Sequence, residues 1–151
     1  LATIAKNEGL TITTEAQEAL FAACGGDCRK MENVLQSCAA LNKHITAENV
    51  YQIASAADPK ELKMVLQKAV DGKFLEARKE LLKVMLSYGL SGLDVIKQIQ
   101  HLVWELAVDD RRKMSLIEAC GEIEFRMVEG SDEFIQLEAL LARFGSSGFG
   151  A

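Results

Sequence analysis

Apolar residues recur along the chain at spacings of three and four, which is the period of an amphipathic α-helix. A clear example is the run Leu62, Val65, Leu66, Ala69 and Val70, whose side chains would share one face of a helix. No long segment alternates apolar and polar residues with the two-residue period of a strand. The pattern therefore predicts an all-α protein.

Residues that favour helix ends divide this pattern into nine expected helices. The expected starts are Thr14 with Gln17, Asp27, Thr46, Asp58-Pro59 with Glu61, Ser91 with Asp94, and Ser131. The expected stops are Gly9, Gly25, Gly72, Gly89 and Gly130. We expect helices near residues 1–8, 14–24, 27–41, 47–55, 59–71, 74–88, 92–108, 112–129 and 132–144.

The single proline, Pro59, predicts a boundary between two domains. It follows Ala56-Ala57-Asp58 and separates four short expected helices from five longer ones. We therefore expect one domain over residues 1–57 and a second over 58–144. The glycine- and serine-rich segment 145–151 has too little apolar surface to offset the entropy of ordering, so we expect a flexible tail.

Composition narrows the class of protein. About half of the 151 residues are hydrophobic (49%), and the net charge is −5 from 17 basic and 22 acidic residues. A chain of this charge has no general attraction for DNA or for anionic membranes, and no apolar stretch reaches the roughly 20 residues that cross a bilayer. We expect a soluble, cytoplasmic protein whose four cysteines are thiols in a reducing compartment.

Three cysteines and a histidine raise the possibility of a zinc site. The candidate ligands are Cys24, Cys28, Cys38 and His44. Cys28 and Cys38 lie ten residues apart on one expected helix, a rise of about 15 Å, which is too far for one metal ion. Buried thiols are the favoured interpretation, and we expect no metal site.

The richest motif is Gly25-Gly26-Asp27-Cys28-Arg29-Lys30, followed by Asn33-Val34-Leu35-Gln36. The glycines end one helix, Asp27 caps the next, and Arg29 projects from its rigid first turn. A lone arginine in this position is more often solvated or capping, but the run resembles the sensor-two motif of clamp-loader ATPases. That resemblance implies a nucleotide-sensing role for Arg29.

Glu32 departs from the pattern of that motif, which usually has an aliphatic residue at this position. It lies three residues after Arg29 and could pair with the guanidinium when nucleotide is absent. An exposed pair of this kind contributes only about 0 to 1 kcal/mol, so we expect Glu32 to tune Arg29 without disabling it.

The phosphate-binding loop of an ATPase is missing from the sequence. Its Gly-Lys-Ser/Thr would have to follow another glycine by five residues, but Gly72-Lys73 precedes Phe74, and Gln67 takes the place of that glycine. The chain also starts without methionine. We expect a C-terminal piece of a longer protein that has no ATPase activity alone, and no catalytic group is recognised.

Longer runs extend the resemblance over most of the chain. Residues 1–55 resemble the helical lid of an ATPase of the AAA+ class. Residues 58–144 resemble the collar domain of the archaeal replication factor C small subunit, through Ala57-Asp58-Pro59, Phe74-Leu75-Glu76-Ala77-Arg78, Tyr88-Gly89-Leu90-Ser91-Gly92, Phe125-Arg126-x2-Glu129-Gly130 and 136–143. Several runs in the expected order make this resemblance specific.

The resemblance implies a role in DNA replication. Subunits of this family assemble through their collars, with a large subunit, into a ring that uses ATP to load a sliding clamp onto primed DNA. ATP and Mg²⁺ would belong to the intact subunit, and Arg29 would reach the γ-phosphate. The alternative is a free-standing helical adaptor whose grooves bind partner helices.

Two further groups of residues are interpreted as parts of the structure rather than as ligand-binding sites. His101 and Trp104 lie three apart on an expected helix, and we expect them to belong to a core or an interface. Arg111-Arg112-Lys113 follows Asp109-Asp110 at a helix start, so we expect a solvated turn rather than a DNA contact.

Overall fold

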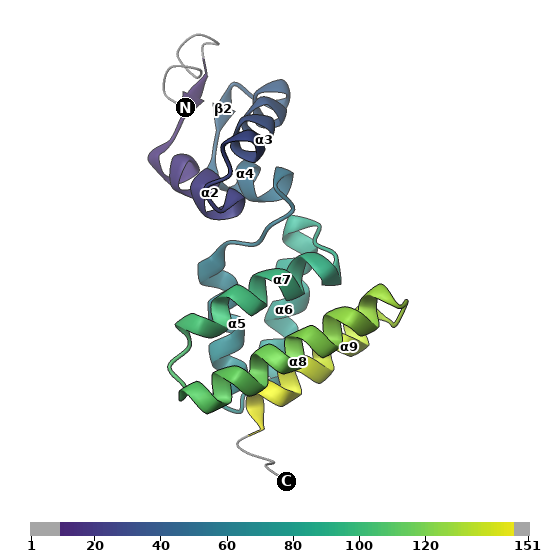
Figure 1. The fold of residues 1–151 in the computed structure, drawn as a ribbon. Helices are drawn as coiled ribbons and strands as arrows, with labels where there is room; N and C mark the ends of the chain where they lie inside the picture. The colour runs from purple at the N-terminus through teal and green to yellow at the C-terminus, as the bar shows by residue number, and fades with distance from the viewer. Residues whose placement is uncertain (1–9, 147–151) are drawn as a thin grey trace. The chain divides into compact units, whose positions relative to one another are not determined.

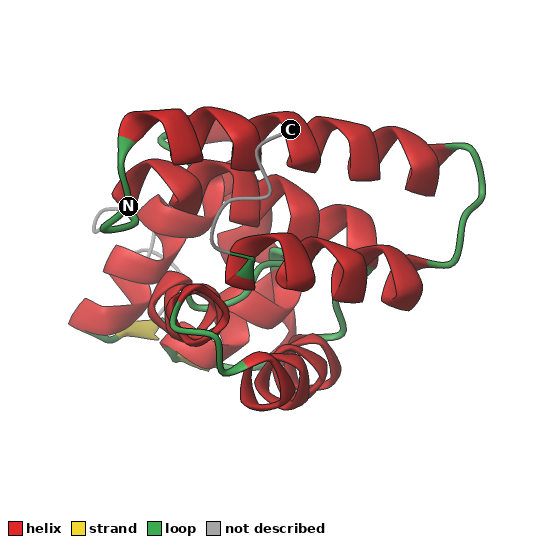
Figure 2. Ribbon diagram, turned by 90° about the horizontal axis from the view of Figure 1, so that it is seen from below, coloured by secondary structure: helices red, strands yellow, loops and turns green. Residues whose placement is uncertain are grey.

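The computed structural model describes residues 10–146 and confirms the all-α class. Its helices, drawn in red in Figure 2, are α2 (Thr14–Cys24), α3 (Cys28–Leu41), α4 (Ala47–Ile53), α5 (Pro59–Val70), α6 (Phe74–Tyr88), α7 (Gly92–Leu102), α8 (Asp110–Val128) and α9 (Glu133–Gly145). The helix expected near residues 1–8 and its stop at Gly9 lie outside the described residues. The chain forms two compact units, Leu1–Asp58 and Pro59–Ala151.

The first unit packs α2, α3 and α4 around a small core. Its most deeply buried side chains include Ala16, Leu20, Leu35, Ile45 and Val50, all at most 1% exposed. Helix α2 contacts both α3 and α4 (Figure 1). Because these three helices are short, α3 depends on its apolar face for its position rather than on helix propensity alone.

Two short strands in the first unit were absent from the sequence prediction. β1 (Thr11–Ile12) pairs in parallel with β2 (His44–Ile45). Each strand has only two residues, too few for a two-residue alternation to be read from the sequence. The pairing also favours Thr13 as the cap of α2, because Thr13 stays extended and its backbone N–H donates to the Ile45 carbonyl at 3.4 Å.

Three of the helix caps are the residues that the sequence predicts, and two differ from the prediction by one residue. Asp27, Thr46 and Ser91 cap α3, α4 and α7 as expected. Helix α2 is capped by Thr13 instead of Thr14, and α9 by Asp132 instead of Ser131. Both corrected residues have extended backbone, which places the side-chain oxygen opposite the free N–H groups of the first turn.

The second unit is a bundle of α5 to α9. Helix α5 packs against α6, α7 and α9, while α8 packs against α7 and α9 (Figure 1). The largest fully buried side chains of this unit are Leu62, Leu66, Ile96, Ile99, Ile123, Leu137, Leu140, Leu141 and Phe144. They come from α5, α7, α8 and α9, so one continuous apolar core holds the bundle together.

Helix α7 is shorter than the sequence pattern predicts. It was expected to continue to residue 108, but it ends at Leu102 and passes into a 3₁₀ turn, η1 (Val103–Glu105). Val103 and Leu106 are both buried, at 0% and 3% exposure. The tighter turn, followed by extended backbone at Leu106, allows both side chains to enter the core.

Glycine is required at the first residue of α7. The Gly92 backbone N–H donates to Glu133 Oε2 of α9 at 2.7 Å. A Cβ at this position would lie 2.7 Å from Glu133 Cβ and 2.9 Å from Met127 Sδ, closer than side-chain atoms approach in proteins. Gly92 therefore lets the start of α7 touch the start of α9.

The basic cluster at the start of α8 is only partly a solvated turn. Arg111 is exposed, as expected, but Arg112 is half-buried and its guanidinium donates to the backbone carbonyl of Phe144. Arg112 therefore satisfies a carbonyl at the C-terminal end of α9. That helix continues to Gly145 and is capped by Ser146, two residues that were expected in the tail; residues 147–151 lie outside the described part.

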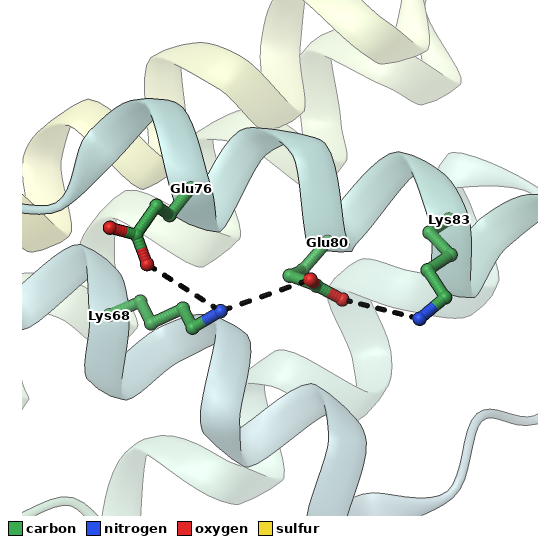
Figure 3. Close-up of polar contacts among 4 residues, drawn as sticks. All are labelled: Lys68, Glu76, Glu80 and Lys83. Atoms are coloured by element: carbon green, nitrogen blue, oxygen red, sulfur yellow. Dashed lines mark ion pairs between the residues drawn. The ribbon is translucent and has the colours of Figure 1, made fainter.

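Ion pairs join the surfaces of neighbouring helices in the bundle. Lys68 of α5 lies 3.8 Å from Glu76 and 3.9 Å from Glu80 of α6, and Glu80 lies 3.8 Å from Lys83 (Figure 3). Because these side chains keep between 33% and 74% of their area exposed, each pair adds at most about 1 kcal/mol. No helix within residues 10–146 is long and apolar enough to cross a membrane.

Candidate functional site

The turn between α2 and α3 depends on two consecutive glycines. Gly25 ends α2 with φ of 61°, and its N–H donates to the Phe21 carbonyl at 3.0 Å. Gly26 follows with φ of 81°. Two consecutive left-handed residues are strongly unfavourable for side chains with a Cβ, so this sharp reversal requires the glycine pair.

Asp27 then fixes the start of α3. Its Oδ1 accepts the backbone N–H groups of Arg29 at 2.9 Å and Lys30 at 3.1 Å. The Lys30 ammonium reaches back across the turn and donates to the Ala23 carbonyl of α2 at 3.2 Å. The aspartate cap was expected from the sequence, whereas the lysine contact was not, because it joins residues seven apart across a turn. Together they hold the first turn of α3 against the end of α2.

The two faces of α3 have different roles. Met31, Val34, Leu35 and Cys38 are buried and face the core of the first unit. Arg29 lies about half a helical turn away from the centre of that face, on the side that also carries the exposed residues Asn33 and Gln36. The packing of one face therefore determines the direction in which the other face presents its polar groups.

Arg29 is exposed and its guanidinium makes no hydrogen bond or ion pair with residues 10–146. The expected partner, Glu32, forms no ion pair with it either. The two residues are three positions apart in the first two turns of α3, but Glu32 lies closer to the edge of the buried face than Arg29 does. The guanidinium therefore has all of its donors available for a ligand.

The residues considered for zinc do not come together around one site. Within residues 10–146 there is no group of three or more histidine, cysteine, aspartate or glutamate side chains placed to hold a metal ion. Cys24 and Cys38 are buried free thiols, as expected, whereas Cys28 is exposed. Burial raises the pKa of both Cys24 and Cys38 above the ordinary thiol value, which disfavours the thiolate that a metal requires.

His101 and Trp104 do not form part of a buried core. His101 is exposed, and Trp104, which lies in η1 rather than in α7, keeps 57% of its area exposed. Of the two expected locations, only an interface remains compatible with this exposure.

A comparison with protein families shows which family the chain belongs to. Residues 57–143, more than half of the chain, match the family described as the replication factor C C-terminal domain. The chain belongs to this family. The match covers α5 to α8 and most of α9. The second unit is therefore the part of the chain that corresponds to the replication factor C C-terminal domain.

Individual relatives extend the similarity through the first unit. The chain is 44% identical over 145 residues to the replication factor C small subunit of Methanocella arvoryzae, covering 96% of this chain and 45% of the relative. It is 46% identical over 141 residues to the replication factor C small subunit of Pyrococcus horikoshii, covering 93% of this chain and 16% of the relative. The chain thus spans less than half the length of these relatives.

Proposed function

We propose that the chain is the lid and collar portion of a clamp-loader subunit. Residues 1–57 would form the helical lid of an AAA+ ATPase module, and 58–144 the collar through which subunits associate. The observation that supports this most strongly is the similarity of about 45% identity across nearly the whole chain to subunits named for replication factor C. The division of the chain between Asp58 and Pro59 is consistent with two such domains.

In the intact subunit, ATP and Mg²⁺ would be held by segments that this sequence does not contain. The residue of this chain that fits a phosphate is Arg29, because its guanidinium is exposed and unpaired within residues 10–146, and its backbone is fixed by a capped helix start. A planar guanidinium can donate to two phosphate oxygens at once. The bound nucleotide would supply the phosphoryl chemistry, and Arg29 would report its presence.

The contacts around the backbone of Arg29 would couple a bound phosphate to movement of the lid. The Asp27 cap, the Lys30 contact with Ala23 and the buried face of α3 connect the backbone of this arginine to the rest of the lid. A phosphate bound by the guanidinium would therefore pull on a backbone segment that is fixed to the rest of the lid, and could move the lid as a body. The sliding clamp and primed DNA would be partners of the assembled ring.

Substitution of Arg29 in the intact subunit tests this role. Arg29→Ala should leave assembly unchanged and reduce ATP-dependent clamp loading by about tenfold or more, because a charge-assisted contact with phosphate is lost. Arg29→Lys, which keeps the charge but donates from a single point, should fall between Ala and wild type. Arg111→Ala, which removes an exposed arginine of the second unit, is the matched control and should have no effect.

Two results would contradict the proposal. Unimpaired loading by the Arg29→Ala subunit would remove the sensing role. Failure of Arg29→Ala to assemble would instead assign the residue to the architecture of the subunit. The alternative of a free-standing helical adaptor is not favoured, because the similar proteins are replication factor C subunits and extend well beyond the length of this chain.

A further inference from the structure

Asn33 lies in the interior of a helix, where asparagine is an unfavourable residue. Of the three asparagines among residues 10–146, Asn42 caps the end of α3 and Asn49 completes the capping box of α4. Asn33 lies inside α3, between the first turn and the middle of the helix. Asparagine is among the weaker helix formers, because its side chain competes with the backbone for hydrogen bonds. Helix stability therefore does not explain its presence.

No side-chain contact within residues 10–146 compensates for this choice. The Asn33 side chain is exposed and forms no hydrogen bond with those residues. Its backbone carbonyl accepts the Ser37 hydroxyl at 2.9 Å, but any residue at position 33 would supply that carbonyl. A residue that breaks a local rule without a structural benefit indicates a functional position.

Asn33 is a neighbour of both cations in the first turn of α3. It follows Arg29 by four residues and Lys30 by three. Residues at these two spacings lie side by side on a helix surface, with Cβ atoms about 5–6 Å apart. We call Arg29, Lys30 and Asn33 the α3 triangle. One small anion can therefore touch more than one of its three side chains.

The charges around the α3 triangle direct an anion toward Asn33. Glu32 lies on one side of Arg29, toward the buried face, whereas Lys30 and Asn33 lie on the other side. Lys30 donates one of its three N–H groups to a carbonyl of α2 at 3.2 Å and keeps the others. The Asp27 carboxylate accepts the backbone N–H groups of Arg29 and Lys30. A phosphate bound by Arg29 is repelled from the Glu32 side and attracted to the other.

We propose that Asn33 is a second phosphate-binding residue of the nucleotide sensor. Its side-chain amide donates an N–H group to an oxygen of the terminal phosphate that Arg29 binds, and Lys30 adds positive charge beside it. An amide suits this position because it donates without adding a net charge. The inference rests on the proposed function of Arg29 and adds a second contact to the same site.

Nucleotide affinity of the intact subunit tests the contact. Asn33→Ala should raise the dissociation constant for ATP about five- to tenfold, because a hydrogen bond to a charged group is lost. The dissociation constant for ADP, which lacks the terminal phosphate, should stay within about twofold of wild type. Isothermal titration calorimetry measures both values.

Replacement of the amide by a carboxylate distinguishes a direct contact from a structural one. Asn33→Asp has nearly the same shape and helix propensity as the wild type, but its negative charge would repel phosphate. It should therefore weaken ATP binding more than Asn33→Ala does, and added salt should reduce the difference. Gln36→Glu makes the same chemical change at another exposed position of α3 and, as the matched control, should change ATP affinity less than about twofold.

The fold of the variants is checked on this chain itself. Asn33→Ala should not lower the melting temperature measured by circular dichroism, because the lost side chain has no partner within residues 10–146 and alanine is the better helix former. A clear fall in melting temperature would assign Asn33 to the structure of the lid and overturn the proposal.

The nucleotide results separate this inference from the proposed function. Normal ATP affinity in both Asn33 variants, or an equal loss for ATP and ADP, would overturn the Asn33 contact. If Arg29→Ala still impairs clamp loading in that case, the sensing role of Arg29 stands without Asn33. If Arg29→Ala has no effect either, the proposed function itself is contradicted.

Discussion

At the scale of single residues, contacts between residues close in the sequence could be predicted, whereas long-range contacts could not. Asp27, Thr46 and Ser91 cap their helices by accepting N–H groups only two or three residues away, so a short pattern was enough to identify them. The contact between Gly92 and Glu133 joins residues 41 positions apart. Nothing in the local sequence of either residue indicates it.

The requirement for glycine at position 92 leads to a matched pair of substitutions. Gly92→Ala should lower the free energy of unfolding by about 1 to 3 kcal/mol, because the added Cβ would overlap Glu133 and Met127. Gly121→Ala, at a helical position with open space around the Cβ, should raise the free energy of unfolding by about 0.5 to 1 kcal/mol. Urea unfolding of both variants measures the difference.

The opposite signs make this prediction specific. If both alanine variants were equally stable, the overlap at Gly92 would be relieved by movement of α9, and the close approach of the two helix starts would not be a constraint on the sequence.

At the scale of elements, helix existence followed from the apolar period, whereas helix ends depended on packing. The expected bounds near 14–24 and 74–88 match α2 and α6. Helix α7 ends early because Val103 and Leu106 have to enter the core, a demand set by the surrounding helices. The pairing of β1 with β2 is likewise set by tertiary structure, since its two strands lie more than 30 residues apart.

The start of α3 is the element-scale feature on which the candidate site depends. Asp27→Ala should lower the free energy of unfolding of the first unit by about 1 kcal/mol, because two backbone N–H groups lose their acceptor. Asp27→Asn keeps an acceptor oxygen and should remain within about 0.5 kcal/mol of wild type. Thermal unfolding followed by circular dichroism gives both values.

The same pair of variants in the intact subunit connects the cap with Arg29. Asp27→Ala should also weaken ATP-dependent loading, because a frayed first turn no longer fixes the direction of the guanidinium. Wild-type loading by this variant would show that α3 is positioned by its buried face alone.

At the scale of the whole molecule, the two units differ in how much core they can form. The first spans 58 residues and the second 93, and the fraction of surface that folding buries rises with chain length. A separately expressed piece of residues 59–151 should therefore unfold cooperatively, and a piece of residues 1–58 should be markedly less stable. Far-UV circular dichroism during heating compares the two.

A substitution tests whether the unfolding transition of the 59–151 piece depends on its hydrophobic core. Leu62→Ala, at a side chain that is 0% exposed, should destabilise the 59–151 piece by about 2 to 5 kcal/mol. A piece that is largely unstructured without residues 1–58 would contradict the expectation of independent folding.

The candidate site could be predicted from the sequence only as far as its local geometry. The glycine turn, the Asp27 cap and the exposure of Arg29 follow from a dozen consecutive residues. The lack of an ion pair between Arg29 and Glu32 does not, since spacing allows the pair and side-chain direction decides it. The hollow of about 330 Å³ that residues of α7 and α8 line, Gly121 among them, was also missed, because it arises where one helix passes another.

The bundle closes with its last helix. Helix α9 packs against α5, Arg112 of α8 holds the Phe144 carbonyl, and Gly145 lies beside the Ala69 carbonyl of α5. A growing chain therefore cannot complete this core until Phe144 has left the ribosome, and until then the part of α5 that packs against α9 stays uncovered. Synthesis that stalls before α9 should leave an intermediate with exposed apolar surface that chaperones bind. Chains that stall only after residue 146 has left the ribosome should yield folded protein when they are released.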